Sequence, residues 1–192
     1  MAWHELIEEL EKKLEGTFKG VYRPLDNIPF FRVQYPPVEE REAIKQFHLL
    51  ADRLCQRGWK AECVSLTELF QEALASLINC SMSELFENLR NLERHRDRSE
   101  LQAKISDFLP DELTKIIVQR FKEWPREGAI FLLRMGSLYP FVRTSSLLSK
   151  LEGKLRCAIV LPYPGTTLGA LLDAPPADPH GGYYRGEVIT WK

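Results

Sequence analysis

Tyrosine, glycine and arginine residues gather beside three apolar segments of this 192-residue chain. The string RMGSLYPFVR follows the first segment, YPG ends the second and YYR precedes the third. Guanidinium groups bind phosphates and carboxylates through paired hydrogen bonds, and tyrosine and arginine concentrate binding energy in protein interfaces. Recognition of an anion or of another protein is therefore the chemistry that these groups offer. The candidate site residues are Arg134, Gly136, Ser137, Tyr139, Pro140, Arg143, Tyr163, Pro164, Gly165, Tyr184 and Arg185.

Ser137 is the residue of this set that could act as a nucleophile. Its local string MGSLY has a glycine on one side only, whereas a hydrolase elbow has the form G-x-S-x-G. We interpret Ser137 instead as the cap of a helix that Tyr139 and Pro140 open. Asp178 and His180 share a glycine-rich loop, and such pairs occur in hydrolytic sites, but an exposed loop histidine is the simpler interpretation. We predict no catalytic residue.

Motifs for cofactors and metals are missing from the sequence. A P-loop has the form G-x-x-x-x-G-K-[ST], but the chain reads QYPPVEER where the first such loop would fall. Proline lacks an N–H donor, and the carboxylates of Glu39 and Glu40 would repel phosphate. G-x-G-x-x-G does not occur, and the histidines and cysteines lack zinc-ligand spacing. We therefore expect neither a cofactor nor a metal.

Strands and helices that alternate along the chain would hold the candidate residues in place. Apolar, β-forming runs predict strands near residues 29–37, 59–66, 129–134, 156–165 and 183–191. Their continuous apolar character predicts an α/β fold with a mainly parallel sheet flanked by helices, similar to a nucleotide-binding fold without a P-loop. The carboxyl ends of parallel strands share one edge, where such folds place their sites. The sequence does not fix the direction of the last strand.

A helical insertion or cap is expected at residues 81–124, within a single α/β domain spanning 1–192. The mixed charges of ERHRDRSE, residues 93–100, are typical of a solvated helix face or of a joint between two helices. Pro110, followed by Asp111 and Glu112, suggests the start of a further helix. Near the amino terminus, Gly16 is expected to end the first helix.

Composition limits the classes of partner. The formal net charge of -1 gives no overall attraction to nucleic acid or anionic membrane, and we expect no intrinsic binding to either. The acidic amino terminus differs from a signal peptide, and no apolar run reaches the roughly 20 residues of a membrane helix. The four scattered cysteines suggest no disulfide framework, so a cytoplasmic location is predicted. The oligomeric state stays open, a homodimer included.

Three strings carry a resemblance to a known family. The strings GAIFLLRMGSLYPFVRTSSLLSKLEG, AIVLPYPGT and YYRGEVI resemble the BrxB family of bacterial BREX (bacteriophage exclusion) defence systems. The segment from Gly136 to Arg143 is the most specific part, and a looser similarity extends from about Phe30 to the chain end. The resemblance implies a component of a multi-gene defence system, with no established catalytic activity and with the alkaline-phosphatase-like protein PglZ as the expected partner.

Two functions therefore stay open. The first is a non-enzymatic adaptor that binds other BREX proteins, PglZ above all. The second is a regulatory domain that binds a small ligand or nucleotide at an anion site on the carboxyl edge of the sheet, through Arg134, Arg143 or Arg185.

Overall fold

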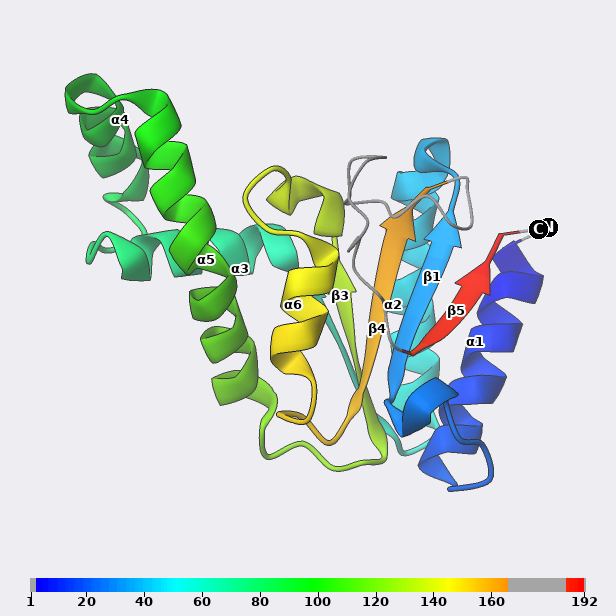
Figure 1. The fold of residues 1–192 in the computed structure, drawn as a ribbon. Coiled ribbons are helices and arrows are strands. Elements are labelled where there is room, and N and C mark those ends of the chain that lie inside the picture. The colour runs from blue at the N-terminus through cyan, green and yellow to red at the C-terminus, as the bar shows by residue number, and fades with distance from the viewer. Residues whose placement is uncertain (1–2, 166–185, 192) are drawn as a thin grey trace.

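Five parallel strands form a single sheet in the computed structural model, which describes residues 3–165 and 186–191 (Figure 1). The strand order is β2-β3-β4-β1-β5, and every neighbouring pair is parallel. The predicted α/β fold with a parallel sheet is confirmed, and the last strand proves parallel to β1. The strands are β1 (Phe30–Tyr35), β2 (Lys60–Ser65), β3 (Gly128–Leu133), β4 (Ala158–Pro164) and β5 (Glu187–Thr190).

Helices cover both faces of the sheet. The α-helices of the described residues are α1 (Trp3–Phe18), α2 (Glu40–Gln56), α3 (Leu66–Leu77), α4 (Leu85–His95), α5 (Arg98–Phe121) and α6 (Thr144–Leu151). Because successive side chains of a strand point to opposite faces, β3 contributes to two separate cores. Its Phe131 packs with the buried residues of α1 and α2, whereas Ile130 and Leu132 pack with those of α3, α5 and α6. The result is a three-layer arrangement with the sheet in the middle.

The connections that leave the neighbouring strands β1 and β4 run toward opposite edges of the sheet: β1 connects to β2, and β4 connects to β5. Helix α2 leads from β1 to β2 across one face, and the helices between β2 and β4 pack on the other face. Ligands of open α/β sheets usually bind outside the carboxyl ends of two such neighbouring strands. The ends of β1 and β4 are therefore the first place to look for a site.

Helix α4 and the amino-terminal part of α5 extend away from the sheet, whereas the rest of α5 packs beside α6 (Figure 1). The charge run at residues 93–100 contains the joint between them, and the carboxylate of Asp97 caps α5 by accepting hydrogen bonds from the backbone N–H groups of Ser99 and Glu100. Pro110 lies inside α5 rather than at a helix start, so that prediction was wrong. Pro110 is buried, and the hydroxyl of Thr114 donates a 2.7 Å hydrogen bond to the carbonyl oxygen of Pro110.

The first helix also departs from the prediction. Helix α1 continues to Phe18 and does not end at Gly16. Gly16 is buried against Tyr22, and a Cβ atom at this position would lie 2.7 Å from the Cβ of Tyr22. The glycine therefore permits close packing between α1 and the chain that follows it, which a sequence pattern cannot distinguish from a helix end.

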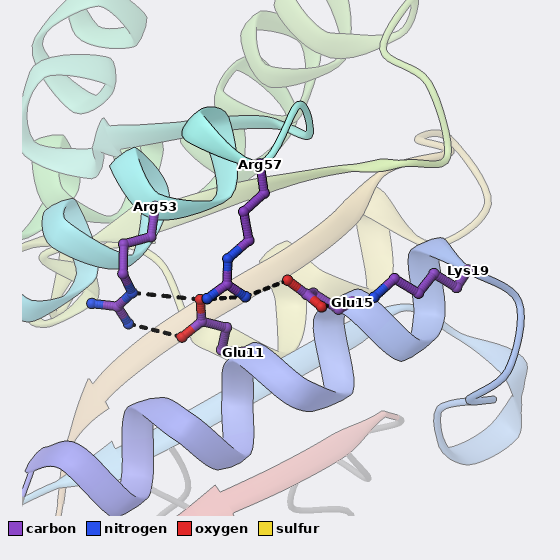
Figure 2. A network of polar contacts seen from close by, with 5 residues as sticks. All are labelled: Glu11, Glu15, Lys19, Arg53 and Arg57. Carbon is purple, nitrogen blue, oxygen red and sulfur yellow. Dashed lines mark hydrogen bonds and ion pairs between the residues drawn. The ribbon is translucent and has the colours of Figure 1, made fainter.

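A network of ion pairs joins α1 to α2 (Figure 2). Glu11 lies 3.0 Å from Arg53 and 3.2 Å from Arg57, and Glu15 binds both Arg57 and Lys19. Hydrogen bonds from Lys19 and Arg57 hold the pKa of Glu15 below its usual value. The arginines of this surface are thus neutralised by carboxylates of the same chain.

Candidate functional site

The loop after β3 carries most of the candidate residues, and polar contacts give it a defined shape. Arg134 adopts a left-handed backbone conformation with φ 65° and turns the chain into a short 3-10 helix, Met135–Leu138. The hydroxyl of Ser137 donates a 2.8 Å hydrogen bond to the carbonyl of Arg134 and accepts one of 3.0 Å from Thr67 at the start of α3. The loop is therefore fixed both to itself and to a neighbouring helix.

The predicted helix start at Tyr139 and Pro140 was wrong. Both residues lie in a turn, and α6 begins only at Thr144, with Arg143 at the cap position. Ser137 accordingly caps no α-helix, and its hydroxyl instead serves the turn that follows β3. The turn is attached to the core because Val142 is buried and the ring centroids of Phe141 and Phe70 lie 5.7 Å apart.

Tyr139 is the most prominent side chain of this loop. Its side chain is large and apolar, yet Tyr139 is 80% exposed. Arg134, Gly136, Ser137 and Arg143 are exposed on the same segment. A tyrosine in this setting is available to a partner, because its own core does not use it.

The second group of candidate residues lies where β4 ends. Tyr163, Pro164 and Gly165 are half-buried, and Tyr163 packs against the core on the α3, α5 and α6 side. The backbone N–H of Gly165 donates a 2.8 Å hydrogen bond to the carbonyl of Tyr35, the last residue of β1. This bond joins the carboxyl ends of β1 and β4, the two neighbouring strands whose outgoing connections run toward opposite edges of the sheet. The YPG group therefore lies at the carboxyl edge of the sheet and also extends the pairing between β4 and β1 by one hydrogen bond.

Two carboxylates follow β1, where a nucleotide-binding fold would carry its phosphate loop. Glu39 accepts a 3.1 Å hydrogen bond from the indole of Trp3, and Glu40 accepts one from the hydroxyl of Tyr35. Burial and then this bond to Glu40 raise the pKa of Tyr35, so the phenol stays neutral. Pro36 and Pro37 offer no N–H donors at this loop. Phosphate would meet negative charge here.

The third group of candidate residues lies outside the residues that the structure describes. Tyr184 and Arg185 lie outside them, as do Asp178 and His180. Gly186 is described and lies beside the backbone of Phe30, where β1 begins. Because β5 runs parallel to β1, the chain enters its last strand at the amino-terminal edge and leaves it at the carboxyl edge with Trp191.

Sequence reasoning missed three residues at the carboxyl edge. Thr67 is not among the candidate residues, although its hydroxyl donates a hydrogen bond to Ser137. Trp3 and Trp191 also reach this end of the sheet, where their rings lie 4.9 Å apart and Trp3 lies 5.7 Å from Tyr35. No local motif marks these residues, since all of the contacts join distant parts of the chain.

A model of the family described as "BREX protein BrxB" matches residues 63–187. The chain belongs to the BrxB family. The match contains the string from Gly136 to Arg143 and the YPG and YYR groups, so the resemblance seen in the sequence is confirmed. The BrxB-family match begins within β2 and leaves β1, α1 and α2 outside it. Membership connects the protein to BREX phage defence.

Other comparisons add little to the family assignment. No curated protein matches the chain. Among solved structures, a chain of the "Structure of Drosophila ORC bound to poly(dA/dT) DNA and Cdc6 (conformation 1)" aligns with a TM-score of 0.41 and 18% identity. The alignment covers 86% of this chain and 25% of that chain, so the BrxB-family protein spans about a quarter of its length.

Metal ligands do not cluster in residues 3–165 and 186–191: no group of three or more His, Cys, Asp or Glu side chains there could hold an ion. Within the same residues, no helix combines the length and apolar character that crossing a bilayer requires. Two cysteines are unsuited to nucleophilic chemistry: loss of solvent contact raises the pKa of the buried Cys157 to about 11 and that of the half-buried Cys63 to about 12.

Proposed function

We propose that this BrxB-family protein is a non-enzymatic adaptor that binds PglZ through the carboxyl edge of its sheet. The observation that carries the proposal is the exposed Tyr139 on a loop whose backbone is fixed by hydrogen bonds. A preorganised loop loses little conformational entropy on binding, and exposed tyrosines and arginines are the residues that dominate interface energies. Arg134, on the same loop, adds a charge that an acidic surface would complement.

The contacts of Ser137 support a binding role over a hydrolytic one. Its hydroxyl donates to a backbone carbonyl and accepts from the hydroxyl of Thr67, and neither group is a base that could remove its proton. A nucleophilic serine needs a hydrogen bond from its own hydroxyl to a general base. Ser137 uses its proton to hold the shape of the loop.

The predicted alternative was an anion site on the same edge. The loop after β1 supports it poorly, because Glu39 and Glu40 lie where phosphate would approach. Docking of a protein tolerates such carboxylates, since a partner can supply matching cations. The adaptor is therefore the function that the carboxyl edge favours.

Binding of purified PglZ to the immobilised protein tests the proposal. We expect the double variant Arg134→Ala/Tyr139→Ala to weaken binding by roughly 30-fold or more, because a single interface hot spot contributes about 2 kcal/mol or more. The matched control is Phe86→Ala on α4, another exposed aromatic residue at 65% exposure, which should bind as the parent protein does.

Both variants should keep the thermal stability of the parent, because the replaced side chains are exposed. Failure of the parent protein to bind PglZ at micromolar concentration would remove the adaptor role. Loss of binding in Phe86→Ala alone would move the docking surface from the sheet edge to the α4–α5 extension.

A further inference from the structure

An open pocket of about 650 Å³ lies at the amino-terminal edge of the sheet, opposite the proposed docking loop. Three of its lining residues are arginines, and each precedes a different strand: Arg23 precedes β1, Arg126 precedes β3 and Arg156 precedes β4. These strands are neighbours in the order β3-β4-β1. The topology of the sheet therefore brings together three cations that are far apart in the sequence.

The three arginines are unpaired within residues 3–165 and 186–191. No carboxylate there forms an ion pair or hydrogen bond with any of them, and all three are exposed. Three other arginines do have carboxylate partners: Arg53 and Arg57 bind Glu11 (Figure 2). Arg120 binds Glu62. The described residues that line the pocket include three arginines and one carboxylate, that of Glu152. The lining is therefore positively charged, although the chain has a net charge of -1.

The pocket also has the size and the walls of a small-molecule site. Its volume falls within the roughly 300–1,000 Å³ typical of ligand pockets. Ile28 and Leu155 add half-buried apolar surface beside the arginines. Tyr22 lines the pocket too. The carboxylate of Glu187 accepts a hydrogen bond from the hydroxyl of Tyr22 and lies 2.6 Å from the Nζ atom of Lys13. One wall is thus held in place without using the arginines.

We propose that this pocket binds a small ligand that carries two or more phosphate groups and is about the size of a nucleotide. Planar guanidinium groups form paired hydrogen bonds with phosphate oxygens, and three of them can neutralise a charge that one cannot. The apolar wall suits a base or another flat group attached to the phosphates. The site lies at the edge of the sheet opposite the docking loop. Binding there would be a second function of the protein.

Thermal unfolding with ATP, inorganic triphosphate or a single-stranded oligonucleotide tests the site. We expect ATP to raise the melting temperature by roughly 5–10 °C at about 100 times its dissociation constant. Inorganic triphosphate should also stabilise the protein, because the arginines recognise phosphate. A larger shift with ATP would add that the apolar wall contributes to recognition.

The double variant Arg126→Gln/Arg156→Gln should lose the response, with affinity falling about 10- to 100-fold for each arginine. Lys154→Gln removes a neighbouring exposed charge that does not line the pocket, and should respond as the parent does. Without ligand, all three proteins should melt within a degree or two of one another. Isothermal titration calorimetry of the same variants measures affinity directly.

Three results would overturn the site: no shift with either phosphate compound at millimolar concentration, an equal shift in the double variant, or a response to the oligonucleotide alone. The test is independent of the adaptor proposal. Arg126→Gln/Arg156→Gln should bind PglZ normally, whereas Arg134→Ala/Tyr139→Ala should keep its response to ATP.

Discussion

The two edges of the sheet differ in how they use charge. At the carboxyl edge, the loop after β1 presents Glu39 and Glu40, and the end of β4 is hydrogen-bonded to the end of β1. At the amino-terminal edge, the loops before three neighbouring strands present exposed arginines around a pocket. Parallel α/β sheets usually place their ligands at the carboxyl edge. In this protein, a pocket lined by three arginines lies at the amino-terminal edge.

This difference separates fold from function. The same parallel sheet can offer a docking loop at one edge and an anion pocket at the other, because loops at both edges are released from core packing. Which edge binds phosphate depends on the side chains and N–H donors of those loops. The chain therefore has a parallel α/β sheet for which we propose a protein partner at the carboxyl edge and a phosphate ligand at the other.

Two glycines give the sharpest test of the comparison. Gly186 has φ 100°, and a Cβ atom there would lie 2.7 Å from the carbonyl oxygen of Phe30, whereas a Cβ at Gly136 would meet nothing within 4 Å. We expect Gly186→Ala to lower the free energy of unfolding by at least about 2 kcal/mol. Gly136→Ala should change it by less than about 0.5 kcal/mol.

Urea unfolding of the two glycine variants measures both values. Equal effects would show that the two edges are equally open, which would contradict the close packing of β5 against the start of β1.

A smaller effect should come from Glu187, which begins β5 at the amino-terminal edge. Burial opposes ionisation of Glu187, but hydrogen bonds from Lys13 and Tyr22 outweigh it, and the net effect is a lowered pKa. A lowered carboxylate pKa stabilises the fold at pH values above the unfolded pKa, and this contribution disappears as the pH falls through the folded pKa. Glu187→Gln should therefore cost about 1–2 kcal/mol at neutral pH and little in acid.

Urea unfolding at neutral and acidic pH compares Glu187→Gln with the parent protein. The control is Glu123→Gln. Glu123 is exposed, and its carboxylate lies 4.0 Å from the Nζ atom of Lys122. An equal loss at both pH values would mean that the contribution of Glu187 comes from packing rather than from its charge.

The smallest effect is expected at the carboxyl edge, for Thr67→Val. This change removes the hydrogen bond to Ser137 and leaves the half-buried side chain similar in shape. We expect a loss of about 0.5–1 kcal/mol in stability, together with weaker binding of PglZ because the loop is less ordered. Thr17→Val is the matched control, since its hydroxyl bonds only within α1, to Lys13. Unchanged PglZ affinity in Thr67→Val would show that loop order is unimportant for docking.

The sequence by itself was sufficient for the fold class and the family. Continuous apolar runs separated by helices predicted a parallel sheet, because strands buried on both faces cannot alternate polar and apolar residues. The string from Gly136 to Arg143 was sufficient for the BrxB resemblance, since it is local and specific. Local rules failed at Pro140 and Pro110: each looked like a helix start, but one lies in a turn and the other inside α5.

Only the tertiary structure decided how distant residues combine. Strand order brings Arg23, Arg126 and Arg156 to one pocket, although more than a hundred residues separate the first from the second. It also pairs Thr67 with Ser137 and joins Gly165 to Tyr35. Sequence patterns report which face of an element is buried, because burial repeats with the period of the element. They do not report which loops share an edge, because that depends on the order in which the strands pair.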